Sequence, residues 1–311
     1  MIPHRAMTTA PPPAPASSAV DQVGLGPLMA RTEGSPQVRV GLVDGPVAHE
    51  HADLSAASVV GVGRRPALCA DPDSRACAHG TFVAGILVAR RGSPAPAVCP
   101  GCTLLVRPIF GESVDASGGP VAVAAEAADA ITECVEAGAS VVNLSAAVGA
   151  PTVRAERALR EALDHAAARG ALVVAAAGNQ GTLGSSEITR HPWVIPVVAV
   201  DGYGRLLGTS NAGASVGRRG LAGPGDATSL SPGSAPERRG GTSVATAFVT
   251  GAAALLRSVF PDAPASAVRR ALVPGAGRRS VVPPLLDARA AFDVLAAMYV
   301  PAPAPPLGEA R

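Results

Sequence analysis

Apolar residues are distributed along this chain in two patterns, short continuous runs and helical spacing. Five short, continuous apolar runs predict buried strands at 38–44, 103–109, 139–145, 171–177 and 194–200. Apolar residues that recur every three or four positions predict helices near 79–90, 120–137, 152–169, 243–259, 263–273 and 286–298. Strands separated by helices are typical of parallel sheets. We therefore expect an α/β fold: a doubly wound parallel sheet with helices on both faces, in three α/β/α layers.

The two ends of the chain differ from this central part. Residues 1–20 are rich in Pro, Ala and Ser, and we predict that they are disordered. Residues 299–311 contain Pro301, Pro303, Pro305 and Pro306, and we predict a disordered tail that does not pack. Residues 21–298 then form one large domain, a size that a single α/β domain can reach.

A small polar motif, Gly241-Thr-Ser-Val-Ala245, opens a long apolar helix. Apolar residues at 244, 248, 252, 255 and 259 keep helical spacing. The Ser243 hydroxyl therefore lies among the free N–H groups of a helix start, where negative charge on a substrate would be stabilised. The alternative is that Ser243 caps the helix, which is the usual role of a serine at such a position.

Three further polar residues stand at the ends of predicted elements. Asp44 ends the strand 38–44, where open α/β sheets place their sites, although Asp-Gly-Pro is also typical of a turn. His79 directly precedes a helix-like run, where a lone His more often caps or is satisfied locally. Asn179 follows the strand 171–177, and its amide either caps a turn or donates to an oxyanion.

In the order Asp44, His79, Asn179 and Ser243, the chain resembles the subtilisin-like serine proteases from about residue 36 to 298. Each residue also keeps a family context: a strand before the Asp, His-Gly-Thr, Ala-Ala-Gly-Asn and Gly-Thr-Ser-x-Ala. Three stretches are more narrowly similar to the proteases that mature cyanobactin peptides: 25–47, which includes Asp-Gly-Pro-Val, 76–81 and 97–110. Those enzymes cut leader or follower segments from ribosomally made precursor peptides.

The resemblance implies a mechanism. Ser243 is the nucleophile, His79 the general base and Asp44 the group that orients the imidazole, while Asn179 and the Ser243 N–H stabilise the oxyanion. Ser145, Ala146 and Ala147 are implied to bind the extended substrate by β-augmentation. Ala147 stands where the family usually has Gly, which favours small substrate residues. Phe82 and Phe248 replace two family histidines, which indicates repacked apolar contacts.

The cysteines leave their pairing open. Cys99-Pro-Gly-Cys102 has a CxxC spacing, but without a second CxxC or a His pair we expect no zinc site. One of Cys69 and Cys77, which flank the loop before His79, is a candidate partner for Cys99 or Cys102. Reduced thiols are the expectation in the cytoplasm. The chemistry requires no cofactor, and any structural calcium site is unassigned.

The resemblance implies a peptide or protein substrate, and charge and hydropathy indicate no other kind of partner. The formal net charge is +2 and the arginines are scattered, so we expect no nucleic-acid contact. No apolar run approaches the roughly 18 residues of a membrane span, so we expect no membrane partner. The N-terminus contains no apolar signal-peptide core and no long pro-domain, and we place the protein in the cytoplasm.

Three functions are compatible with these residues. The first is a serine endopeptidase that processes a ribosomally made precursor peptide. The second is a macrocyclase of the same fold, which passes the acyl-enzyme to an amine. Cyclising relatives carry a helical insertion between Asp and His, whereas 34 residues separate Asp44 from His79 here, which favours hydrolysis. The third is a non-catalytic peptide-binding protein, in which we would expect a catalytic residue to be missing.

Overall fold

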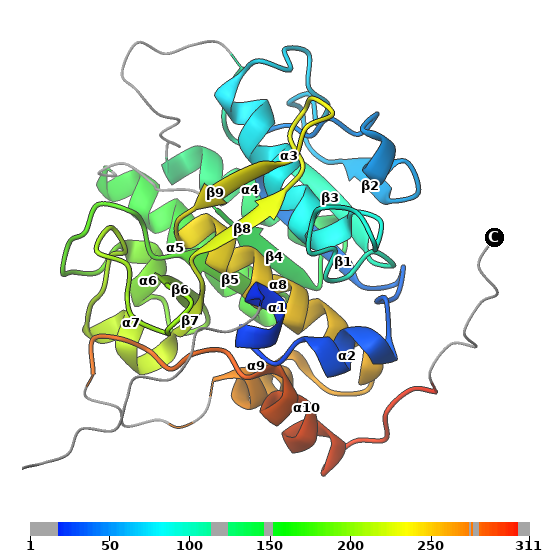
Figure 1. Cartoon of the computed structure of the whole chain (residues 1–311). Coiled ribbons are helices and arrows are strands. Elements are labelled where there is room, and N and C mark those ends of the chain that lie inside the picture. The colour runs from blue at the N-terminus through cyan, green and yellow to red at the C-terminus, as the bar shows by residue number, and fades with distance from the viewer. Residues whose placement is uncertain (1–17, 113–123, 146–151, 274, 276–279, 304–311) are drawn as a thin grey trace, which may run out of the picture.

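The computed structural model describes residues 18–112, 124–145, 152–273, 275 and 280–303 (Figure 1). Parallel strands form its centre: β1 Arg39–Asp44, β2 Ser58–Gly61, β3 Thr103–Pro108, β4 Val141–Leu144, β5 Leu172–Ala176, β6 Ile195–Val200 and β7 Leu221–Pro224. Their order across the sheet is β2-β3-β1-β4-β5-β6-β7. The chain therefore adds β2 and β3 on one side of β1 and β4 to β7 on the other. The connections diverge between β1 and β4, the kind of point where open α/β sheets bind ligands.

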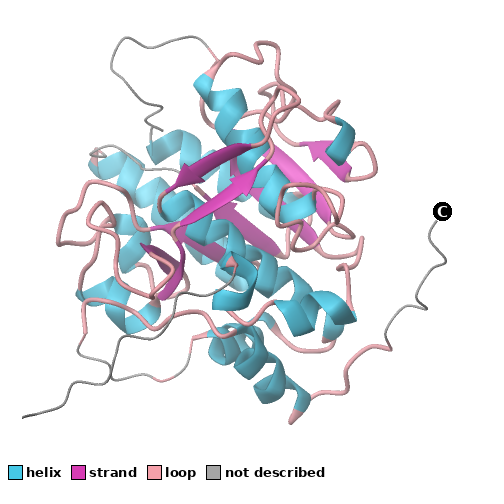
Figure 2. Cartoon of the chain, viewed as in Figure 1, coloured by secondary structure: helices cyan, strands magenta, loops and turns pink. Residues whose placement is uncertain are grey.

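Helices cover both faces of this sheet (Figures 1 and 2). The longer ones are α3 Arg75–Val88, α4 Ala124–Glu136, α5 Val153–Ala168, α8 Thr242–Val259, α9 Ala265–Leu272 and α10 Ala288–Ala296. Alternate strand residues separate the two cores: Val40 and Leu42 pack with α3 and α8, whereas Val43 packs with α4 and α5. The predicted doubly wound sheet in three layers is confirmed.

The edge strands β2 and β7 were not predicted, because neither has the sequence of a buried strand. β2 is Ser-Val-Val-Gly and is largely exposed at the edge of the sheet. β7 is Leu-Ala-Gly-Pro, in which Gly-Pro would indicate a turn. Their pairing with β3 and β6 is decided by those neighbours, whose residues are all buried.

Helix α8 is the most deeply buried helix. Its length and composition would suit a membrane span, but 83% of it is enclosed by the fold, as in the core helix of a globular domain. One side packs against β4 to β7 and another against α3. An antiparallel hairpin, β8 Asp226–Ser229 and β9 Glu237–Gly240, leads directly into its first turn (yellow in Figure 1). The start of α8 is therefore fixed by both the core and this hairpin.

The shorter helices lie nearer the surface and were not predicted: α1 Ala19–Gln22, α2 Gly26–Arg31, α6 Glu187–Arg190 and α7 Ala214–Arg219, with a 3-10 turn, η1, at Ala52–Leu54. The disorder predicted for residues 1–20 is wrong for residues 18–20, because Ser18 caps α1 and the helix begins at Ala19. Residues 1–17 lie outside the described part of the chain. The amide of Ala288 donates to the Val23 carbonyl, so the N-terminal helices lie against α10.

The prediction that residues 299–311 do not pack is wrong for its first part. Tyr299 packs against the main core, and the Ala302 amide donates to the Val259 carbonyl at 2.7 Å. The prolines do not prevent this, because Pro removes only its own N–H group and leaves its neighbours free to bond. Residues 304–311 lie outside the described part of the chain.

We expect the core around α8 to dominate stability. Leu256→Ala removes a fully buried side chain and should lower the free energy of unfolding by about 2–5 kcal/mol. The matched control, Leu183→Ala, changes a side chain that is 79% exposed and should stay within about 0.5 kcal/mol of the unsubstituted protein. Denaturant unfolding measures both, and equal effects would contradict this assignment of the core.

Candidate active site

Asp44 and His79 form the buried part of the site. Asp44 ends β1 with no solvent exposure, and its Oδ1 lies 2.6 Å from His79 Nδ1 and 2.6 Å from the Gly45 amide. The contact between Asp44 and His79 depends on two glycines that let α3 approach the end of β1. A Cβ on Gly45 would lie 2.0 Å from the Ala76 carbonyl oxygen, and one on Gly80 would lie 2.4 Å from that of Pro46.

His79 is not at the start of its helix, as we predicted, but in its second turn. Helix α3 begins at Arg75, and the Ser74 hydroxyl caps it by accepting from the Cys77 amide. Apart from Arg75, this first turn contains only the small residues Ala76, Cys77 and Ala78, so no bulky apolar residue marks it in the sequence. His79 therefore has no capping role. Its Nδ1 is engaged by Asp44, which leaves Nε2 for other partners.

Burial lowers the pKa of His79, and the nearby Arg239 cation also lowers it. The charge of Asp44 and the hydrogen bond that it accepts from His79 act in the opposite direction and prevail, so that the pKa of His79 is raised above 6.5. The imidazolium is thus stabilised beside a carboxylate, as a general base requires when it receives a proton.

Ser243 occupies the second position of α8. The N-cap is Gly241, whose φ of 126° suits glycine, and a Cβ there would crowd the Asn179 amide. The alternative that Ser243 caps this helix is therefore wrong. Instead, the Ser243 hydroxyl donates to the Ser145 carbonyl at 3.3 Å. Its backbone N–H is among the first four of the helix, which have no acceptor within the helix.

Asn179 is held with its amide oxygen toward the start of α8. That oxygen accepts from the Thr242 amide at 2.9 Å and from the Thr242 hydroxyl at 3.1 Å. The NH₂ group of Asn179 is left on the other side, and Asn179 lines the same cleft as Ser243. Thr242, which is fully buried, thereby orients the amide. We did not predict this role from the sequence, although Thr242 stands inside the Gly-Thr-Ser motif.

A buried polar chain fixes the strand end opposite Ser243. The Thr250 hydroxyl donates to Asn143 Oδ1 at 2.9 Å, and Asn143 Nδ2 donates to Ser145 Oγ at 2.7 Å. This chain links α8 to β4 through side chains that are almost completely buried. Of the predicted substrate-binding residues, Ser145 is thus beside Ser243, whereas Ala146 and Ala147 fall outside the described residues.

The predicted catalytic and oxyanion residues come together in one place. His79, Asn179 and Ser243 line a cleft of about 510 Å³, and Asp44 lies behind His79. The cleft is completed by α3, β9 and the start of α8: Arg75, Phe82, Val83, Glu237, Arg239, Gly240 and Val244. The arrangement brings a hydroxyl, a base with an orienting carboxylate, and an amide donor to the carboxyl end of the sheet.

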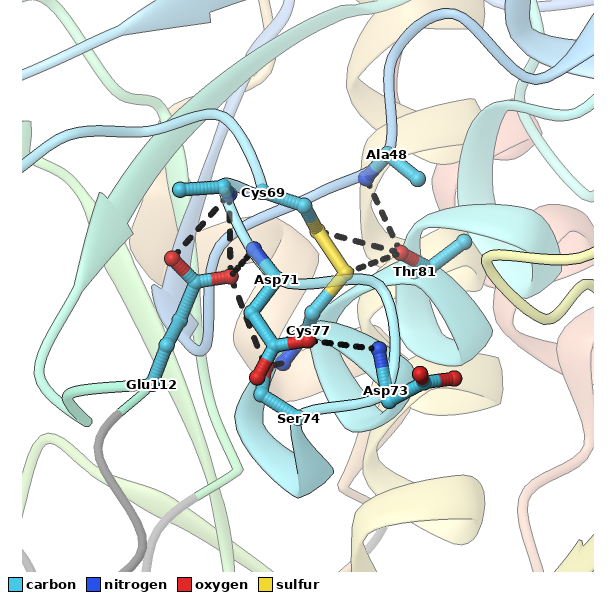
Figure 3. The surroundings of a disulfide bond; sticks show 9 residues. Ala48, Cys69, Asp71, Asp73, Ser74, Cys77, Thr81 and Glu112 are labelled. Carbon is cyan, nitrogen blue, oxygen red and sulfur yellow. Dashed lines mark hydrogen bonds between the residues drawn. A yellow bond between two sulfur atoms is a disulfide. The ribbon is translucent and has the colours of Figure 1, made fainter.

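A disulfide joins Cys69 to Cys77, just before His79 (Figure 3). Our candidate pairing of either with Cys99 or Cys102 is wrong, because Cys99, Cys102 and Cys134 are free and buried. The Thr81 hydroxyl lies 3.9–4.0 Å from both bridged sulfurs and accepts from the Ala48 amide. The bridge therefore holds the loop against the helix that carries His79.

Among the described residues, one group of possible metal ligands lies close together, and it is in this same region. A Glu112 carboxylate oxygen and the sulfurs of Cys69 and Cys77 lie within 4.8 Å of one another. The disulfide removes both thiolates as ligands, and Glu112 accepts from the Ala70 and Asp71 amides instead. Elsewhere, burial raises the pKa of the Cys134 thiol to about 12, which leaves it inert at neutral pH.

Comparison with known proteins shows which protein family and which solved structures this chain is similar to. Residues 35–292 match the profile of the Subtilase family. Subtilisin DY from Bacillus licheniformis is 32% identical over 241 residues, which cover 76% of this chain and 82% of that protein. Among solved structures, a mutant of the protease domain of PatA superposes with a TM-score of 0.76 at 30% identity, covering 85% of this chain and 97% of that one. The prenylagaramide maturation protease PagA gives 0.75 at 27% identity, covering 88% and 98%.

The electrostatics of the Asp44–His79 pair can be tested directly. We expect the pKa of His79, measured by NMR titration of its ring proton, to lie above 6.5. Asp44→Asn removes the causes that raise it and leaves burial and Arg239, so the pKa of His79 should fall below 6.5. His79→Gln assigns the resonance, and an unchanged pKa in Asp44→Asn would refute this account.

The disulfide should contribute to stability through the eight-residue separation that it closes. Reduction of the protein, or the double substitution of Cys69 and Cys77 by Ser, should lower the free energy of unfolding by about 2.5 kcal/mol. The double variant is its own control, because added reductant should not destabilise it further. A wild-type protein that unfolds identically with and without reductant would rule out this contribution.

Proposed function

The chain belongs to the Subtilase family and is a serine-type endopeptidase, and on that basis we propose that it cleaves a ribosomally made precursor peptide during maturation. The observation that carries the proposal is the likeness to PagA, itself a maturation protease, which extends over 98% of that chain. PatA, at 30% identity over 97% of its protease domain, adds support.

We propose that Ser243, His79 and Asp44 act as a catalytic triad. The Ser243 hydroxyl turns from the Ser145 carbonyl toward His79, gives its proton to Nε2 and attacks the scissile carbonyl. Because Nδ1 is fixed on Asp44 at 2.6 Å, Nε2 is the nitrogen that is free to accept. Catalysis needs neutral His79, so the rate should rise as the pH passes upward through its raised pKa.

The oxyanion would be stabilised by two donors that meet beside the start of α8. One is the Asn179 NH₂ group, which Thr242 leaves on the cleft side, and the other is the Ser243 N–H. Loss of the equivalent side-chain donor in subtilisin costs about 3–4 kcal/mol of transition-state stabilisation. These groups are side chains and backbone, so we propose no cofactor for the chemistry, and a structural calcium site stays unassigned.

The substrate would lie extended beyond the end of β4. Ser145 is the described residue of this segment, and it is fixed by the Thr250–Asn143 chain. We propose that Ser145, Ala146 and Ala147 pair with the substrate backbone before the cleaved bond. The methyl group of Ala147 would narrow this side and favour small residues.

Hydrolysis is favoured over macrocyclisation by the segment between Asp44 and His79. All 34 residues of it are described, and they form only the 3-10 turn η1, strand β2, loops and the first turn of α3. This segment provides no helical cover that would keep water from an acyl-enzyme. We propose water as the acceptor.

The cellular compartment stays a prediction. We placed the protein in the cytoplasm because its N-terminus contains no apolar signal-peptide core. The Cys69–Cys77 disulfide weighs against this placement, because such bonds are typical of oxidising compartments. Counting free thiols in protein taken directly from its native cells would distinguish the two.

A fluorophosphonate probe tests the nucleophile. Wild-type protein should gain one adduct by intact mass, and Ser243→Ala should gain none, because the probe reacts with an activated serine. Ser258→Ala, in the same helix but at its far end, should react like wild type. A folded wild-type protein without an adduct would contradict the triad and favour the binding-only alternative.

A further inference from the structure

One wall of the cleft carries charged side chains. It is built from α3 and β9, and three of its lining residues are ionised: Arg75, Glu237 and Arg239. Arg239 and Glu237 of this wall form an ion pair with each other. The charge of Arg239 also lowers the pKa of His79, which shows that the two groups lie within electrostatic reach.

Arg239 is held in place by two contacts, and some of its N–H donors are not used by them. Its guanidinium lies over the Phe82 ring, 5.8 Å from the centroid, and one Nη2 donates to Glu237 Oε2 at 2.9 Å. Its Nε is buried and has no acceptor among the described residues. A guanidinium offers five N–H donors, so a carboxylate could bind it without displacing Glu237.

Arg238, the neighbouring residue on β9, has a different environment. Residues i and i+1 of a strand point to opposite faces, and Arg238 is exposed and donates from Nε to Asp226 at 2.9 Å. It therefore belongs to the outer side of the β8–β9 hairpin, away from the lining of the cleft. The two arginines differ in position but not in chemistry, which makes Arg238 a matched control.

The position of Arg239 relative to the reaction decides which part of a substrate it meets. In a triad mechanism, protonated His79 gives its proton to the leaving amine, so the chain after the cleaved bond departs past the imidazole. Arg239 and Phe82 line the cleft together with His79, in the wall formed by α3 and β9, so we place the leaving chain beside them. Ser145, by contrast, belongs to the end of β4, where we place the residues before the bond.

We propose that Arg239 is a specificity-determining residue that selects an acidic side chain at one of the first two positions after the cleaved bond. This inference rests on the proposed function, because it takes its orientation from the triad. A substrate carboxylate would bind the guanidinium, with Phe82 holding the plane of Arg239 and Glu237 limiting its rotation. Lys or Arg at the same substrate position would be repelled.

The test is cleavage of a proteome-derived peptide library, with the cut sites read by mass spectrometry at a pH well above the pKa of His79. Wild-type protein should show Asp and Glu enriched at one of the two positions after the cut. For a pair of cleaved peptides that differ only by Glu or Gln there, we expect kcat/KM to favour Glu by about tenfold, as for a charge-assisted hydrogen bond. Arg238→Gln should retain this ratio.

Variants at Arg239 give the decisive comparison. Arg239→Gln should bring the Glu-to-Gln ratio to about one, Arg239→Lys should retain part of it, and Arg239→Glu should shift the preference toward basic residues. A labelled, active wild type without an acidic preference, or a preference unchanged in Arg239→Gln, would overturn this inference alone. Failure of fluorophosphonate labelling at Ser243 would overturn the proposed function and this inference with it.

Discussion

The fully buried carboxylate of Asp44 sets the geometry on which the rest of the site depends. A charged group without solvent needs hydrogen-bond donors, and here Oδ1 receives the Gly45 amide and His79 while Oδ2 has no partner among the described residues. The contact with His79 requires α3 to lie directly against the end of β1, which the missing side chains of Gly45 and Gly80 permit. The carboxylate therefore stabilises the imidazolium and at the same time fixes where the helix can pack.

Helix α8 couples the core to the chemistry in a similar way. Its buried length packs mainly against β4 to β7, and its first turn carries Ser243. Thr242 orients Asn179, and Thr250, two turns later, orients the end of β4 through Asn143. A shift of this helix against the strands that it packs on would move the nucleophile, the oxyanion donor and the substrate strand together. The reacting groups are thus held by the rigid part of the fold, where small displacements are costly.

The two sides of the cleft serve different ends. Ser145 is the described residue on the β4 side, and we propose that this side recognises an extended peptide through its backbone, with little dependence on the peptide sequence. The wall of α3 and β9 is charged, and Arg239 lies on it over Phe82. Phe82 stands at a position where the resembled family usually has His. Replacement of that His by Phe thus supplies a flat surface for a guanidinium as well as an apolar contact. Selectivity is concentrated where the cleaved segment leaves.

The sequence by itself determined the central strands and the longer helices. It also singled out Asp44, His79, Asn179 and Ser243 as candidate site residues, because each of these four stands next to a buried run and within a local motif. The edge strands β2 and β7 have no such signature, since their pairing is imposed by β3 and β6. The tertiary structure alone decided that Cys69 bonds to Cys77, that His79 lies in a second helical turn, and that Arg239 faces the cleft while Arg238 faces away. These facts depend on contacts between segments far apart in the chain, and local patterns of polarity hold no information about which segments meet.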